Sequence, residues 1–399
     1  MTYLVVGAGL AGAKAVESLR DEGFGGPVTL IGAEPLRPYE RPPLSKGLLL
    51  GTDDPESPFV HSTDWYAEKD ITLRTGTTVT AIDRAAKIVR LDGGEEVAYE
   101  RLLLATGSTP RQLPVPGGDR ALLLRTLPDS RRISDAITKD TRVVVVGAGW
   151  IGLEVAAAAR TRGATVTVVG SSRLPLQNVL GDEIAQVFLD LHRANDVTFH
   201  LDARAVRVDA DAVHLADGTT IAADVVIAGI GVTPNVALAA DAGLAVDNGV
   251  LADRSLTTSD PDIFVAGDIA NVDHPLLRHR IRVEHWATAM HTGPAAARAM
   301  LGQDVSYDRL PYFYTDQYDL GMEYTGWLPP GAEPELVVRG DLATREFIAF
   351  WLLDGRVAAG MNVNVWDVTD QIEALIRSNA VIERARLADP SVGLSDLLS

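Results

Sequence analysis

Two glycine-rich segments carry the residue pattern that binds the pyrophosphate of a dinucleotide. The first, Gly7-Ala-Gly9-Leu-Ala-Gly12, follows an apolar run at 3–6, and a second copy spans 147–152, at an offset of 140 residues. In this fingerprint the first glycine permits a tight turn, the second lets the backbone approach the pyrophosphate, and the third lets the next helix pack closely on the strand. The N-terminus of that helix offers N–H groups and a positive dipole end to phosphate. Two copies predict two bound nucleotides.

An acidic residue is placed to bind the ribose of the first nucleotide. Glu34 follows an apolar strand at 27–31 and lies 27 residues after Gly7. The usual separation is about 20 residues, and a long turn at 22–26 accounts for the difference. We therefore expect Glu34 to accept a hydrogen bond from an adenosine ribose.

The elements that must position these loops form an α/β pattern that occurs twice. The strand before Ala105-Thr106-Gly107 and the strand before Gly229-Ile-Gly231 end in similar turns, so the internal repeat extends beyond the glycine loops. We expect buried parallel strands at 3–6, 27–31, 101–104, 142–146, 164–169 and 224–231, and short antiparallel strands within 71–91 and 197–221. We expect helices at 13–19, 150–160, 182–193 and 286–301. A rigid Pro-Pro loop is expected at 38–46 and a linker at 110–118. Alternating segments at 336–339, 345–352 and 356–361, with a helix near 367–378, predict a separate α+β domain.

Composition excludes several classes of function. The chain of 399 residues has no cysteine, which excludes disulfides, thiolate catalysis and an iron–sulfur cluster held by its own thiolates. Redox chemistry here therefore requires a bound organic cofactor, and we expect no metal site. A net charge of −18 argues against general nucleic-acid binding. No apolar run approaches the roughly 18 residues of a membrane span, and without a basic and hydrophobic leader before the first strand the expected location is cytoplasmic.

Eight segments, in chain order, resemble the FAD-dependent pyridine-nucleotide oxidoreductases, specifically the ferredoxin, putidaredoxin and rubredoxin reductase branch. The segments are 7–12, 41–46, 104–107, 147–154, 229–235, 266–268, 284–286 and 313–318. A single glycine motif arises by chance, whereas eight ordered matches do not. The resemblance implies a glutathione-reductase-like α/β architecture with two Rossmann-like domains and a C-terminal α+β domain. The implied boundaries are 1–112 with 232–305 for an FAD domain, 113–231 for an NAD(P)H domain, and 306–399 for the C-terminal domain.

The resemblance also implies a role for each matching residue. The FAD site would have Gly7, Gly9, Ala11 and Gly12 at the pyrophosphate, Glu34 at the adenosine ribose, Asp268 at the ribitol chain, the Trp286 backbone at the pyrimidine edge of the ring, and further contacts from Arg41, Lys46, Val79, Ala105, Thr106, Gly107, Arg125, Glu284 and Tyr314. The NAD(P)H site would have Gly147, Gly149, Ile151, Gly152, Glu154, Ser171, Ser172, Arg173, Gly229 and Gly231. A loop cap is the ordinary alternative for Asp268, and a core aromatic cluster is the alternative for Tyr314, which stands where this branch often has tryptophan.

Lys46 and Glu154 are the predicted catalytic pair. In the family the lysine after the Pro-Pro loop pairs with the glutamate after the second glycine motif, beside the flavin where nicotinamide stacks. Such a pair can swing to admit the ring and can hold charge near the flavin as hydride arrives. The alternative for Glu154 is an ordinary first-turn glutamate favoured by the helix dipole.

Two departures from the family pattern bear on chemistry. Related disulfide reductases carry a cysteine near Lys46, and this chain has none. NADH-using relatives commonly place an acidic residue after the strand at 164–169, where this chain has Gly170. Because no carboxylate there would repel a 2′-phosphate, we expect NAD(P)H to be used with NADPH tolerated, with Ser171, Ser172 and Arg173 near that phosphate.

The function that the resemblance implies is electron transfer from NAD(P)H through FAD to a separate iron–sulfur ferredoxin, which supplies a monooxygenase such as a cytochrome P450 or another oxygenase. Arg278, Arg280 and Arg282 form the densest basic segment, and we expect them to dock ferredoxin; a solvated strand edge is the alternative. An NAD(P)H oxidase or diaphorase that reduces oxygen or quinones, and a redox-controlled binding flavoprotein related to apoptosis-inducing factor, are the competing functions. The expected assembly is a monomer or weak homodimer.

Overall fold

The computed structural model describes residues 2–398, and contacts within the chain divide them into two compact units. Unit 1 comprises 2–40, 56–109 and 233–311, and unit 2 comprises 41–55, 110–232 and 312–398. Each unit is therefore assembled from three separate stretches of sequence. Two short strands, β8 (Ser108–Pro110) and β16 (Val232–Pro234), lie where the chain passes from one unit to the other. The three functional domains expected from the sequence stay a prediction.

A five-stranded parallel sheet is the centre of unit 1, in the order β18-β7-β1-β2-β3. Its apolar strands are buried because helices cover the sheet, as parallel sheets require. The sequence predicts antiparallel pairing for the strand that begins at Ile71; this is wrong, since Ile71 pairs in parallel with Val28. The strands are β1 (Tyr3–Val6), β2 (Val28–Ile31), β3 (Ile71–Arg74), β7 (Arg101–Leu104) and β18 (Ile263–Val265).

The remaining elements of unit 1 are helices and two small sheets. The helices are α1 (Leu10–Asp21), α3 (Thr63–Glu68), α8 (Ala237–Asp241) and α9 (Trp286–Met300), with a 3-10 turn at Gly267–Ile269. One small sheet is antiparallel and contains β4 (Val79–Asp83), β5 (Ile88–Leu91) and β6 (Glu96–Ala98). The other contains β17 (Val250–Ala252), β19 (Ala270–His274) and β20 (His279–Ile281).

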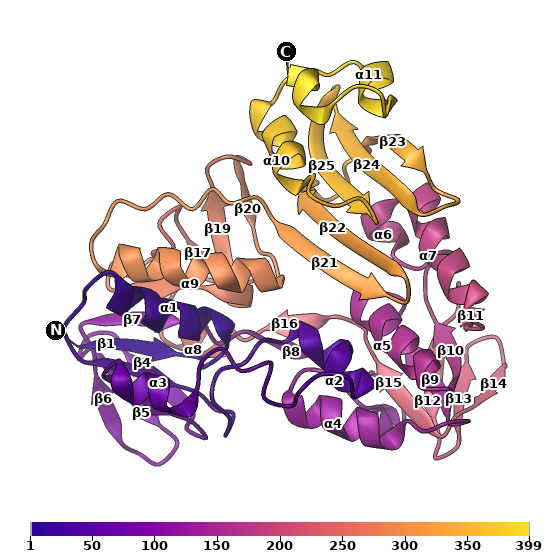
Figure 1. Ribbon diagram of the computed structural model, residues 1–399. Coiled ribbons are helices and arrows are strands. Elements are labelled where there is room, and N and C mark those ends of the chain that lie inside the picture. Colours follow the sequence, from indigo (N-terminus) through magenta and orange to yellow (C-terminus); the bar gives the residue numbers. More distant parts are fainter. Residues whose placement is uncertain (1, 399) are drawn as a thin grey trace. The chain divides into compact units, whose positions relative to one another are not determined.

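Helices α1 and α9 lie side by side (Figure 1), and a glycine lets them approach closely. A Cβ atom on Gly293 would lie 2.3 Å from the carbonyl oxygen of Ala11. Helix α9 is also tied to β1, because the Tyr3 hydroxyl donates to the carbonyl of Met300 at 2.8 Å. The close approach of α9 fixes α1, the helix that begins at the first glycine loop.

A second parallel sheet, in the order β11-β10-β9-β15, lies in unit 2. Its strands are β9 (Arg142–Val146), β10 (Thr165–Val169), β11 (Thr198–His200) and β15 (Val225–Ala228). The prediction of antiparallel strands over 197–221 is wrong for β11, where Phe199 pairs in parallel with Val168. It holds for β12 (Ala205–Val208), β13 (Ala212–Leu215) and β14 (Thr220–Ala222), which are antiparallel.

The helices of unit 2 include several that the sequence analysis does not predict, among them α4 (Leu127–Ala136), α6 (Gln177–Leu180) and a pair near residue 45. The expected rigid loop at 38–46 contains a 3-10 helix, Pro42–Ser45, which leads into α2 (Gly47–Leu50). Proline at the first helical positions suits such a turn because its fixed φ matches the helix. The other helices before the C-terminal sheet are α4, α5 (Trp150–Thr161), α6 and α7 (Asp182–Ala194), with a 3-10 turn at Gly118–Arg120.

A five-stranded antiparallel sheet completes unit 2, in the order β21-β22-β25-β24-β23. Its elements are β21 (Tyr312–Gln317), β22 (Leu320–Gly326), β23 (Glu335–Asp341), β24 (Glu346–Leu353), β25 (Arg356–Val363), α10 (Thr369–Ser378), α11 (Arg384–Ala388) and a 3-10 turn at Leu394–Leu398. Phe188 and Leu191 of α7 share one core with Met322 and Met361 of this sheet. That core joins the C-terminal sheet to the second nucleotide-binding repeat.

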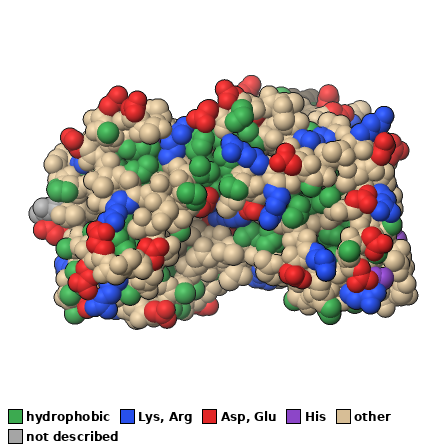
Figure 2. Space-filling view, turned by 90° about the horizontal axis from the view of Figure 1, so that it is seen from below, with side chains coloured by type: hydrophobic (Ala, Val, Ile, Leu, Met, Phe, Trp, Pro, Cys, Tyr) green, Lys and Arg blue, Asp and Glu red, His purple; other side chains and the backbone are tan. Residues whose placement is uncertain are grey.

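No helix within residues 2–398 has the length and apolar character needed to cross a bilayer. On the face drawn in Figure 2, acidic and basic side chains are interspersed and stand singly or in small groups.

Candidate functional site

The first glycine loop has two positions where the backbone itself requires glycine. Gly7 has φ +116°, and a Cβ atom there would lie 2.1 Å from the carbonyl oxygen of Ala105. A Cβ atom on Gly12 would lie 2.1 Å from the carbonyl oxygen of Gly7. These close approaches bring β1, the start of α1 and the turn after β7 together, as the fingerprint predicts.

Neither the backbone conformation nor the packing of protein atoms requires a glycine at Gly9, the middle glycine of the loop. Its φ is −91°, which any residue adopts, and a Cβ atom on it would meet no protein atom within 4 Å. It is the residue before α1, a helix with neither a side-chain cap nor an acidic residue in its first turn. Uncapped N–H groups and the positive end of a helix dipole suit a phosphate. The missing side chain therefore leaves room for a ligand, and the loop fits the FAD pyrophosphate.

The second loop repeats this geometry. Gly147 also has φ +116°, with its Cβ position 2.3 Å from the carbonyl oxygen of Gly229, and that of Gly152 lies 2.0 Å from the carbonyl oxygen of Gly147. Gly149, with φ −89°, again faces open space at an uncapped helix start. Beside it Ile151 is a large apolar side chain left 47% exposed. This loop fits a second nucleotide.

One expected FAD contact of unit 1, Asp268, lies in a segment that contacts the helix of the first loop. Gly267, next to Asp268, has φ +71°, and a Cβ atom on it would lie 3.2 Å from the Cβ of Ala11. Asp268 itself lies on the 3-10 turn that follows β18, and its carbonyl accepts a hydrogen bond from Arg282 at 3.1 Å. Glu34 follows β2 and accepts a hydrogen bond from the hydroxyl of Tyr39.

Thr106 is fixed by Asn235 through two hydrogen bonds. Its hydroxyl donates to the Asn235 carbonyl at 2.8 Å, and its own carbonyl accepts from the Asn235 side-chain amide at 2.9 Å. Gly107 follows with φ +67°. Asn235 therefore holds the Ala-Thr-Gly turn against the first glycine loop, a role that the sequence did not assign to it.

The other predicted contacts are placed as follows. Val79 begins β4, and the ring nitrogen of Trp286, at the start of α9, donates to Glu40 at 3.0 Å. In unit 2, Arg41 donates to the carbonyl of Arg125, so two expected flavin contacts are adjacent.

Two of the three arginines in the basic segment, Arg280 and Arg282, make hydrogen bonds or ion pairs within the protein. Arg280 donates to the carbonyls of Ala252 and Asn271, each at 3.0 Å. The Arg282 side chain is only 10% exposed and pairs with Glu284. Arg278 lies exposed in the turn between β19 and β20.

The residues expected to select the coenzyme follow β10. Gly170 is crowded, because a Cβ atom there would lie 2.9 Å from the Cβ of Ala148. Ser171 is exposed and Ser172 half-buried. Arg173 forms an ion pair with Asp182, at the start of α7. The guanidinium expected near a 2′-phosphate therefore already has a carboxylate beside it.

Lys46 and Glu154 form the expected ion pair within unit 2. The Lys46 ammonium lies 2.8 Å from Glu154 Oε1, and the Glu154 side chain is 5% exposed against 18% for Lys46. The ammonium also lies 5.5 Å from the centre of the Tyr314 ring, within the range of a cation–π contact. The ion pair is present; its catalytic role stays a prediction.

Two further donors to Glu154 were missed by the sequence analysis. The Ser45 hydroxyl donates to Oε2, and the Thr315 hydroxyl donates to Oε1 at 2.6 Å. Both hydroxyl residues are buried. The strand alternation of 312–317 was the available signal, since it puts Thr315 and Gln317 on the face opposite Tyr314.

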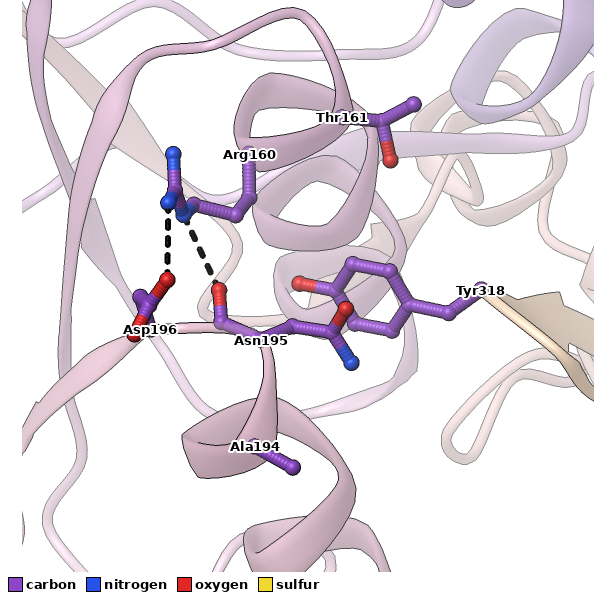
Figure 3. A pocket seen from close by; sticks show the side chains of 6 residues that line it. All are labelled: Arg160, Thr161, Ala194, Asn195, Asp196 and Tyr318. Atoms are coloured by element: carbon purple, nitrogen blue, oxygen red, sulfur yellow. Dashed lines mark hydrogen bonds and ion pairs between the residues drawn. The ribbon is translucent and has the colours of Figure 1, made fainter.

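A separate polar pocket of about 220 Å³ opens at the end of α7. Arg160 lies along it and holds Asp196 and the carbonyl of Asn195, while the ring of Tyr318 forms another side (Figure 3). Thr161 and Ala194 complete the lining.

Comparisons with known proteins agree with this geometry. Residues 1–293 match the family described as pyridine nucleotide-disulphide oxidoreductase, and residues 312–398 match its reductase C-terminal family. The chain is 41% identical to the ferredoxin–NAD(+) reductase component of an anthranilate 1,2-dioxygenase system from Burkholderia cepacia, covering 99% of each chain. It is 36% identical to a putidaredoxin reductase from Pseudomonas putida, over 99% of this chain and 96% of the relative.

A solved structure matches the whole fold. The reductase in a covalent putidaredoxin reductase–putidaredoxin complex superposes with a TM-score of 0.96 at 36% identity, covering 100% of this chain and 98% of that one. Two nucleotide loops of the same geometry, joined to a matching C-terminal sheet, thus place this chain in the pyridine nucleotide-disulphide oxidoreductase family, within its ferredoxin–NAD(+) reductase branch, as an enzyme that uses FAD and a pyridine nucleotide.

Proposed function

We propose that this protein passes electrons from NAD(P)H through FAD to a separate iron–sulfur ferredoxin that supplies an oxygenase. The observation that carries the proposal is the pair of glycine loops, each with a middle glycine that faces open space at an uncapped helix start. The chain has no cysteine with which to hold an iron–sulfur cluster. A ferredoxin acceptor is supported by the names of the relatives, one of which belongs to a dioxygenase system. The oxygenase is either a cytochrome P450 or a ring-hydroxylating dioxygenase.

The division of labour follows from the two loops. Gly7, Gly9 and Gly12 bind the FAD pyrophosphate with backbone N–H groups, while Glu34 and Asp268 accept hydrogen bonds from hydroxyl groups. FAD held there would supply the conversion between a two-electron hydride donor and a one-electron acceptor.

The second loop binds the exchanging coenzyme, and the Lys46–Glu154 pair completes this part of the site. Glu154 keeps Lys46 in place before the coenzyme arrives, and Lys46 swings aside to admit the nicotinamide. The ammonium supplies positive charge where negative charge develops, which is the usual electrostatic contribution of such a group.

Coenzyme choice rests on the residues after β10. NADPH tolerance is supported by the absence of an acidic residue at Gly170, and it is opposed by the carboxylate of Asp182 beside Arg173. We propose that both coenzymes reduce the flavin and that Asp182 limits the use of NADPH.

Ferredoxin docking is proposed for the surface around Arg278. Arg278 is the best of the three arginines for a charge reversal, because Arg280 and Arg282 donate hydrogen bonds to backbone carbonyls and their substitution would also disturb the fold. Rim charges act mainly on the association rate and its salt dependence. The monomer or weak homodimer and the cytoplasmic location stay predictions.

The deciding experiment compares acceptors. Purified flavoprotein with NADH is assayed for cytochrome c reduction with and without an added [2Fe–2S] ferredoxin, and for peroxide formation in air. We expect reduction to depend on ferredoxin and Arg278→Glu to raise the KM for ferredoxin several-fold at low salt. Rapid peroxide formation that ferredoxin does not suppress would support an oxidase instead.

A further inference from the structure

A buried row of polar side chains leads away from Glu154 through unit 2. The Thr315 hydroxyl lies 2.6 Å from Glu154 Oε1, the Gln317 amide nitrogen lies 3.2 Å from the Thr315 hydroxyl, and His192 Nε2 lies 2.8 Å from Gln317 Oε1. Thr315 and Gln317 are each 1% exposed and His192 is 0% exposed. The row joins α5, β21 and α7, and its far end adjoins Tyr318, whose ring centre is 5.2 Å from that of His192.

Every hydrogen bond in this row has one possible direction. An ionised carboxylate only accepts, so the single hydroxyl proton of Thr315 goes to Glu154. The hydroxyl oxygen then accepts from the amide of Gln317, which turns the amide oxygen toward His192. Burial lowers the pKa of His192 to about 4, so its ring is neutral and the one N–H donates from Nε2. All the donors therefore point toward Glu154, and aligned hydrogen bonds strengthen one another.

The two members of the ion pair are held very unequally. Glu154 accepts from Ser45, Thr315 and Lys46, and is 5% exposed. Asp316 interacts electrostatically with both Lys46 and Glu154; burial raises the pKa of Asp316, and Lys46 acts to lower it. Among the described residues the Lys46 ammonium contacts only the Glu154 carboxylate and the face of Tyr314. Without Lys46, Glu154 keeps two hydrogen-bond donors. Without Glu154, the Lys46 ammonium keeps, among the described residues, the face of Tyr314 and the charge of Asp316.

We propose that Thr315, oriented by Gln317 and His192, is a positioning residue that keeps Glu154 fixed while Lys46 is the member of the pair that moves when coenzyme binds. The inference rests on the proposed role of this pair in admitting the nicotinamide. Ser45 secures the second carboxylate oxygen, so both oxygens of Glu154 are held without Lys46. A fixed carboxylate gives Lys46 one return position after each turnover.

Crystal structures of the flavoprotein with and without NAD(+) test the movement directly. We expect Glu154 to stay within hydrogen-bond distance of Thr315 and Ser45 in both, with the Lys46 ammonium more than a hydrogen bond away from Glu154 in the coenzyme complex. A complex in which Glu154 leaves Thr315, or in which Lys46 stays on Glu154, would overturn the proposal.

Matched variants test the role of the hydroxyl. Thr315→Val keeps the shape and removes the donor, Thr315→Ser keeps the donor, and Tyr318→Phe removes a buried hydroxyl that has no hydrogen-bond partner among residues 2–398. We expect Thr315→Val to slow NADH reduction of the flavin about tenfold, since a hydrogen bond to a charged group is worth about that factor or more, with the equilibrium dissociation constant of NAD(+) changed less than twofold.

The controls separate this inference from the proposed function. Thr315→Ser should restore the rate and Tyr318→Phe should match the wild type. An unchanged rate in Thr315→Val, or a loss that Thr315→Ser does not restore, would remove the positioning role alone. Failure of NADH to reduce the wild-type flavin would instead contradict the proposed function.

Discussion

Buried polar side chains decide much of the chemistry of this chain at the scale of single residues. The sequence analysis paired Lys46 with Glu154 but left out Ser45 and Thr315. These hydroxyls are 109 and 161 residues from Glu154 in the sequence. Local patterns predict which residues are buried in a strand, but they do not reveal which distant partner a hydroxyl meets. The positions of Gly7 and Gly12 were easier to predict, because the fingerprint itself requires glycine where the backbone makes these close approaches.

The buried His192 predicts an acid-sensitive fold. Its pKa is lowered to about 4 by burial, from an ordinary value of 6.5. As pH falls from 6.5 toward 4, the unfolded chain binds a proton that the folded chain cannot, so the free energy of unfolding falls. Below pH 4 both states bind it and this loss levels off, after a total of about 3 kcal/mol.

Urea unfolding at several pH values, with excess FAD, measures this effect. His192→Gln retains a donor toward Gln317 and does not titrate, so its stability should change less between pH 6.5 and 4 than that of the wild type. Equal pH dependence in the two proteins would mean that folding does not lower the pKa of His192.

Asp182 is expected to limit the use of NADPH through Arg173. Asp182→Asn removes the charge that pairs with Arg173 and would repel a 2′-phosphate. Since exposed charge pairs are weak, we expect kcat/KM for NADPH to rise by up to about fivefold relative to NADH. Asp190→Asn, at an exposed position further along α7, is the control. The same ratio in all three proteins would remove Asp182 from coenzyme selection.

At the scale of elements, the sequence predicts the two nucleotide-binding repeats well because each has a local signature. Apolar strands, glycine turns and helix periods place β1, α1, β9 and α5 correctly. Strand direction was wrong for β3 and β11, because alternation within a strand does not reveal which neighbour it joins. The 3-10 helix at Pro42–Ser45 was missed because proline pairs are equally compatible with extended loops.

The contact between α1 and α9 offers a test at this scale. Gly293→Ala would place a Cβ atom 2.3 Å from a backbone oxygen of α1. In an open helix glycine to alanine stabilises by about 1 kcal/mol, but here overpacking should reverse the sign and destabilise by about 1–3 kcal/mol. Gly25→Ala, where a Cβ meets no atom within 4 Å, is the control in thermal unfolding. A stabilised Gly293→Ala would mean that the helices separate without cost.

At the scale of the whole molecule, duplication explains why one chain can use two nucleotides. Each repeat supplies a parallel sheet and a glycine loop with open space beside its middle glycine. The surroundings then differ. The first loop has Glu34 and the Asp268 segment beside it, whereas the second shares its unit with Lys46, Glu154 and the C-terminal sheet. We infer that the first loop holds FAD through the catalytic cycle and that the second binds a coenzyme that exchanges.

Replacing the middle glycine of each loop with valine is the most direct test of this division between a retained FAD and an exchanging coenzyme. Gly9→Val and Gly149→Val make the same substitution at backbone angles that valine tolerates, into space that protein atoms do not fill. Both proteins are purified, their FAD content is read from the visible spectrum, and each is titrated anaerobically with NADH. We expect Gly9→Val to lose FAD, and we expect Gly149→Val to keep FAD that dithionite still reduces but NADH no longer does. Full FAD content in Gly9→Val, or normal NADH reduction in Gly149→Val, would contradict this division.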